Sequence, residues 1–187
     1  MRLLIVNAFE DSDIPLRAVS KSLSQLPVAI STLDLVKEGF GDFMSPSERE
    51  AYHLENNLVS PAQKTSAELV KNTEGLILCY PLINDLFPAI VKSWFERVFI
   101  PGVSFTFSES GRVKGALKNL QHIHFLALTE PNMKRMKRSN PSKSLLRAIR
   151  MNAGLRCRSS LSLIHDLESF GISARENLMK GGYFRQR

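Results

Sequence analysis

The chain has 187 residues, 43% of them hydrophobic, and a formal net charge of +7. That length supports one domain with a sizeable core and is too short for two ordinary domains, so we expect residues 1–187 to form a single domain. No apolar run approaches the roughly 18 residues of a membrane-spanning helix. The run that follows Met1 and Arg2 is also shorter than the core of a signal peptide. We therefore expect a cytoplasmic protein without a membrane span.

Short apolar runs alternate with stretches of helical periodicity along the chain. The runs are rich in branched side chains, which is typical of strands buried in a parallel sheet. The predicted strands are residues 2–7, 28–35, 75–80, 122–129 and 160–164. The predicted helices are residues 15–26, 61–72, 88–99 and 142–152, with a weak one from residue 173. A small hairpin is expected around Ser110 and Gly111.

This order of elements defines the expected fold class. Strands that alternate with helices form a parallel sheet with helices on both faces. We therefore predict a three-layer α/β sandwich around a five-stranded parallel sheet. In such sheets ligands bind beyond the carboxyl ends of the strands, where the strand order reverses. The candidate site then consists of three loops, residues 8–14, 81–87 and 129–133.

Neither the cysteines nor the histidines indicate a metal site. Cys79 and Cys157 lie far apart, and the chain contains no CxxC pair and no Cys/His cluster. His122 and His124 alternate on a predicted strand and therefore share one face, where packed histidines are the simpler interpretation. The first loop also lacks the GxGxxG pattern of dinucleotide-binding folds.

A basic segment extends from Lys134 to Arg158. No acidic residue occurs between Pro131 and His165. Such a block can bind a nucleotide phosphate, a nucleic acid, an anionic membrane surface or an acidic protein, or it can form a solvated face. Aromatic residues are nearly absent from it, which does not favour nucleic-acid binding. We predict an anionic partner as one option for this segment.

Two segments carry a family resemblance. Residues 44–53 read MSPSEREAYH, and residues 88–99 read PAIVKSWFERVF, preceded by Tyr80-Pro81-Leu82. In order and spacing they resemble the NAD(P)H:quinone oxidoreductase family, which has a flavodoxin-like fold, over roughly residues 1–130. The resemblance implies bound FMN or FAD, NAD(P)H as co-substrate and a small-molecule acceptor such as a quinone. It also implies a homodimer with the site at the interface.

The resemblance assigns cofactor-binding roles to residues of the three loops. Ser12 would lie near the flavin phosphate. The residues that would line the flavin are Pro81, Leu82, Ile83, Asn84, Phe87 and Thr129. No catalytic residue is assigned, because the tyrosine and histidine that assist hydride transfer in some members have no counterpart at residues 133–140.

The same loops depart from the family pattern. Glu10, Asp11 and Asp13 crowd the expected phosphate position, unless they cap the following helix instead. Where the family has a Thr-Thr-Gly-Gly-like turn, this chain reads Thr129-Glu130-Pro131-Asn132, so Glu130 adds a charge and Pro131 removes a backbone donor. Two functions follow. The favoured one is a flavin-dependent NAD(P)H:quinone-type oxidoreductase. The alternative is a flavodoxin-fold protein without redox activity, a regulatory subunit such as the ancillary protein of a potassium efflux system.

Overall fold

The computed structural model describes residues 1–130, 140–154 and 156–181. Its centre is an all-parallel sheet with the strand order β2-β1-β3-β6-β7. The strands are β1 (Arg2–Asn7), β2 (Ala29–Asp34), β3 (Gly75–Pro81), β6 (His122–Leu128) and β7 (Arg158–Ile164). The predicted five-stranded parallel sheet is confirmed, and its order is that of flavodoxin-like folds.

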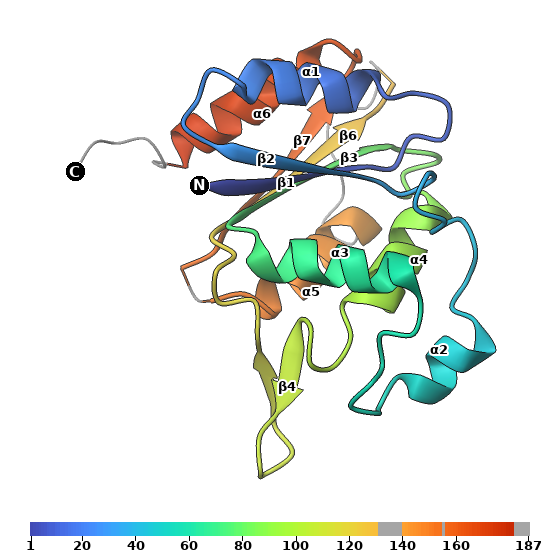
Figure 1. Cartoon of the computed structure of the whole chain (residues 1–187). Helices are drawn as coiled ribbons and strands as arrows, with labels where there is room; N and C mark the ends of the chain where they lie inside the picture. Colours follow the sequence, from blue (N-terminus) through green and yellow to red (C-terminus); the bar gives the residue numbers. More distant parts are fainter. Residues whose placement is uncertain (131–139, 155, 182–187) are drawn as a thin grey trace.

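Helices cover both faces of the sheet (Figure 1). One face carries α1 (Ile14–Leu23) and α6 (Ser169–Lys180). The other carries α3 (Pro61–Asn72), α4 (Ala89–Val98) and α5 (Pro141–Met151). A short helix, α2 (Pro46–Ala51), lies to the side in the segment between β2 and α3. The predicted three-layer α/β sandwich is therefore confirmed.

The sheet separates two apolar cores, and alternate residues of each central strand point into one or the other. On β1, Leu4 and Val6 pack with the α3–α4–α5 side, whereas Leu3 and Ile5 pack with the α1–α6 side. Because both faces are covered, β3 is buried along almost its whole length. This accounts for continuous apolar runs in the sequence rather than alternating ones.

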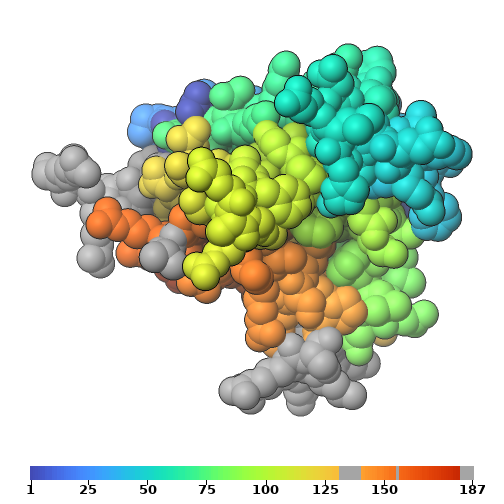
Figure 2. Space-filling model, turned by 90° about the horizontal axis from the view of Figure 1, so that it is seen from below, coloured from blue at the N-terminus to red at the C-terminus, as the bar shows by residue number. Residues whose placement is uncertain are grey.

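The predicted hairpin forms from β4 (Phe105–Phe107) and β5 (Val113–Gly115), which pair antiparallel. It projects away from the sheet (Figure 1). Seen from below, the hairpin lies between the orange surface of α5 and the cyan segment that contains α2 (Figure 2). It is remote from the carboxyl ends of the strands.

The last helix differs from the prediction. It begins at Ser169, four residues before the expected Ser173. Gly171 lies in the first turn, and because glycine is a poor helix former, the sequence did not indicate a helix there. Gly171 is required by packing: a Cβ there would lie 2.6 Å from the backbone oxygen of Ala18 in α1. The periodicity of the first helix also overestimated its length, since α1 ends at Leu23.

We expect Gly171→Ala to destabilise the protein by about 1–3 kcal/mol, because the new methyl group meets backbone that cannot move aside. Gly41→Ala is the matched control, since nothing lies within 4 Å of a Cβ at that position. Urea unfolding of the two variants measures the effect. Equal stability of the two variants would show that α1 and α6 can separate without cost.

Candidate functional site

The strand order reverses between β1 and β3, and this marks the edge where a ligand is expected. In the sheet, β2 lies beside β1 on one side, whereas β6 and β7 follow β3 on the other. In folds with such a reversal, ligands bind in the crevice at the carboxyl ends of the strands. Asn7 and Cys79 are register partners at that end.

A tight turn follows β3. The amide of Ile83 donates to the carbonyl of Leu86, and the amide of Leu86 donates back, both at 2.9 Å. Asn84 and Asp85 between them have φ values of 51° and 65°. These left-handed conformations at both central positions are those of a type I′ turn, and Asn and Asp adopt them more readily than other side-chain-bearing residues.

A pocket of about 410 Å³ lies between this turn and the end of β6. It is lined by Leu82, Asn84, Asp85, Thr129 and Glu130. Backbone hydrogen bonds fix its base, because Leu82 donates to Leu128 and Thr129 donates to Ile164, each at 2.8 Å. The structure thus brings together three of the predicted site residues, Leu82, Asn84 and Thr129.

The other predicted residues of the second loop do not line this pocket. Pro81 is the last residue of β3 and is half-buried. The side chain of Ile83 is 58% exposed, and Phe87 packs against the core on the α4 side. Their contact with a cofactor stays a prediction.

Ser12 lies in the loop after β1 and is also outside the pocket lining. Its carbonyl accepts a hydrogen bond from Asn7 Nδ2 at 3.1 Å, and its Oγ accepts one from the backbone amide of Ile14 at 3.2 Å. Asp13 is the N-cap residue of α1, but its side chain makes no capping hydrogen bond. It pairs with Arg17 at 2.9 Å, which neutralises one of the three acids of the loop.

Asn7 is a candidate site residue that sequence reasoning did not single out. It is fully buried at the carboxyl end of β1. Its Nδ2 donates to Ser12 and to Asp34 Oδ2 at 3.2 Å, whereas its Oδ1 has no hydrogen-bond partner among the described residues. A buried acceptor without a partner suits a hydroxyl donor. A polar residue at the end of an otherwise apolar strand was the available signal.

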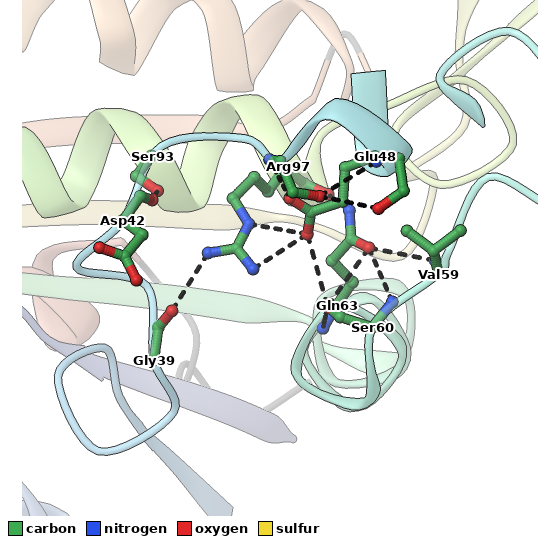
Figure 3. A network of polar contacts seen from close by, with 10 residues as sticks. Gly39, Asp42, Glu48, Val59, Ser60, Gln63, Ser93 and Arg97 are labelled. Atoms are coloured by element: carbon green, nitrogen blue, oxygen red, sulfur yellow. Dashed lines mark hydrogen bonds and ion pairs between the residues drawn. The ribbon is translucent and has the colours of Figure 1, made fainter. Parts of the chain in front are cut away.

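The two motifs that carried the family resemblance meet in the structure (Figure 3), and neither Glu48 nor Arg97 lines the pocket. Arg97 of α4 places Nε and Nη2 each 2.9 Å from Glu48 Oε1, and both side chains are buried. Glu48 Oε2 also accepts the amide of Ser45, which closes the capping box of α2. Arg97 Nη1 donates to the backbone carbonyl of Gly39 at 3.1 Å. The backbone carbonyl of Arg97 accepts a hydrogen bond from Gln63 Nε2 of α3. The motifs thus fasten the β2–α3 segment to α4.

The basic segment is described only in part, because residues 131–139 lie outside the described residues. Within the remainder, Arg147, Arg150, Arg156 and Arg158 are exposed. An anionic partner for this segment stays a prediction. In the part of the chain that the structure describes, no three His, Cys, Asp or Glu residues gather as metal ligands do, and no helix is long and apolar enough to cross a membrane.

Comparison with known proteins places this geometry in a family. Residues 1–155 match the family model described as the flavodoxin-like fold, so the chain belongs to that family. The FMN-dependent NADH:quinone oxidoreductase of Shewanella loihica is 34% identical over 86 residues, which are 46% of this chain and 39% of that protein. The corresponding Azotobacter vinelandii enzyme is 27% identical over 93 residues, 50% of this chain and 44% of that protein.

A solved structure agrees with these matches. The NAD(P)H:quinone oxidoreductase from Methanothermobacter marburgensis superposes with a TM-score of 0.69 at 19% identity, covering 97% of both chains. At that identity the superposition shows a shared fold. The matched regions span less than half the length of the two curated relatives. The resemblance to NAD(P)H:quinone oxidoreductases that the motifs indicated is confirmed.

Proposed function

We propose that this protein is an FMN-dependent NAD(P)H oxidoreductase that reduces a quinone or a similar small molecule. The observation that carries the proposal is the pocket between the 83–86 turn and Thr129, at the carboxyl ends of β3 and β6. It adjoins the strand-order reversal where ligands bind in this class of fold. The flavin named for the relatives, FMN, is the cofactor we assign, and a homodimer remains part of the proposal.

The residues of the pocket and of the loop after β1 suit FMN by their chemistry. Leu82, Asn84 and Thr129 would hold the ring, in a pocket of about 410 Å³ that lies within the usual size range for ligand sites. Asn7 Oδ1 would accept a ribityl hydroxyl. Ser12 Oγ accepts from Ile14 and keeps its own proton, so it would donate to the phosphate beside the start of α1. When bound, FMN supplies the transfer of a hydride from NAD(P)H to the acceptor.

Flavin uptake tests the proposal directly. The purified protein is incubated with FMN or FAD, freed of unbound flavin by gel filtration, and its visible absorption is compared with its protein concentration. We expect about one FMN retained per chain. Protein that stays colourless after both incubations would refute the proposal.

Glu130 offers a charge-based test of where the flavin binds. Its exposed carboxylate flanks the pocket and repels the negatively charged phosphate of FMN. We therefore expect Glu130→Gln to tighten FMN binding about two- to fivefold at low ionic strength. Added salt should reduce this gain, because it screens the repulsion. Glu109→Gln, at the exposed tip of the hairpin, is the matched control. If both variants bind FMN alike in fluorescence titrations, the flavin is bound elsewhere.

A further inference from the structure

One buried amide joins the start of α5 to the turn that forms the pocket. Asn140 is the N-cap residue of α5 and only 6% exposed. Its Oδ1 accepts the backbone amide of Ser142 at 2.8 Å. Its Nδ2 donates to the backbone carbonyl of Asp85 at 2.8 Å, across 55 residues of sequence. Both ends of the side chain are therefore engaged, one in the helix and one in the turn.

The turn needs such an anchor. Asn84 and Asp85 both adopt left-handed backbone conformations, which are unfavourable for residues with side chains. Their side chains are exposed. Among the described residues, the bond from Asn140 is the hydrogen bond that attaches Asp85 to another secondary-structure element. That bond therefore ties the tip of the turn to the start of α5.

We propose that Asn140 is a positioning residue for the cofactor: it fixes the Asn84–Asp85 turn in the conformation that receives the flavin ring. This inference rests on the proposed function. Asn140 does not line the pocket itself and acts through the carbonyl of Asp85. The affinity for flavin then depends on a residue at the start of α5, through its hydrogen bond to the turn.

The chemistry of the position is specific for an amide. Asp and Ser cap helices about as well as Asn, because each supplies an oxygen for the amide two or three residues later. Ionised Asp has no proton to donate to the carbonyl of Asp85, and the Ser hydroxyl is too short to span both partners. Asn140→Asp and Asn140→Ser therefore keep the cap and remove the anchor. Because one variant is charged and the other neutral, an effect common to both is not due to charge.

The test compares Asn140→Asp and Asn140→Ser with wild type and with Asn152→Ser. Asn152 ends the same helix and donates to Ala148 at 3.1 Å, so its replacement makes a matched change far from the turn. We expect both Asn140 variants to raise the dissociation constant for FMN about five- to tenfold, as the loss of one buried hydrogen bond implies. The absorption bands of bound FMN should also shift relative to wild type.

Amide hydrogen exchange supplies a readout that needs no flavin. In the Asn140 variants we expect faster exchange at Ile83 and Leu86, the paired amides of the turn, and unchanged exchange at Ser142, which reports the cap. FMN affinity equal to wild type in both variants would overturn the inference. If wild type itself binds no FMN, the proposed function fails, and the exchange at Ile83 and Leu86 still decides whether Asn140 positions the turn.

Discussion

Replacing Arg97 with methionine is expected to lower the free energy of unfolding by about 3–5 kcal/mol. The guanidinium is the partner of Glu48, whose side chain is 3% exposed, and removing it leaves a buried carboxylate without its counter-charge. The hydrogen bond to the carbonyl of Gly39 is lost as well. Urea unfolding monitored by the fluorescence of the single tryptophan, Trp94, measures the change.

Lys92→Met is the matched control for this prediction. Lys92 lies on the same helix and pairs with Glu96 at 3.4 Å, but both side chains are largely exposed. Exposed pairs contribute about 0–1 kcal/mol, so we expect little change. Replacing Glu48 together with Arg97 by methionine should recover part of the loss, because no unpaired charge remains. If Arg97→Met were as stable as Lys92→Met, the buried pair would not hold the β2–α3 segment.

Much of the fold could be predicted because its signals are local. Apolar runs located every strand of the sheet, and the helix predicted over residues 61–72 is α3. The start of α6 escaped because Gly171 is a poor helix former, and its packing partner in α1 lies far away in the sequence. Likewise, the sequence contains both Glu48 and Arg97, but nothing local shows that they meet.

The candidate site was predictable to the extent that topology determines it. The rule that ligands bind beyond the carboxyl ends of strands located Leu82, Asn84 and Thr129, which do share a pocket. Asn140 was missed because its role arises from a hydrogen bond that crosses 55 residues. Asp85 was missed because a left-handed backbone conformation is not visible in residue type alone.

Two buried histidines give the stability of the protein a dependence on pH. His122 and His124 lie on β6 and face the core under α6, with exposed fractions of 5% and 3% and ring centroids 5.9 Å apart. His124 Nδ1 lies 2.7 Å from Ser160 Oγ. Burial lowers the pKa of each imidazole to about 4, helped by Arg158 for His122 and by His122 for His124. Both rings are therefore neutral in the folded protein at physiological pH.

We expect the free energy of unfolding to be level above pH about 6.5 and to fall as the pH drops toward 4, by about 2–3 kcal/mol for each imidazole. In that window the unfolded chain binds protons that the folded protein cannot accept, so acid favours unfolding. His124→Asn retains a polar atom near Ser160 and should remove about half of the slope in urea unfolding between pH 4 and 7. The exposed His53 provides the control, His53→Asn, which should keep the full slope. An unaltered slope in His124→Asn would show that the ring accepts a proton within the fold, which would require the α6 face to open to solvent in acid.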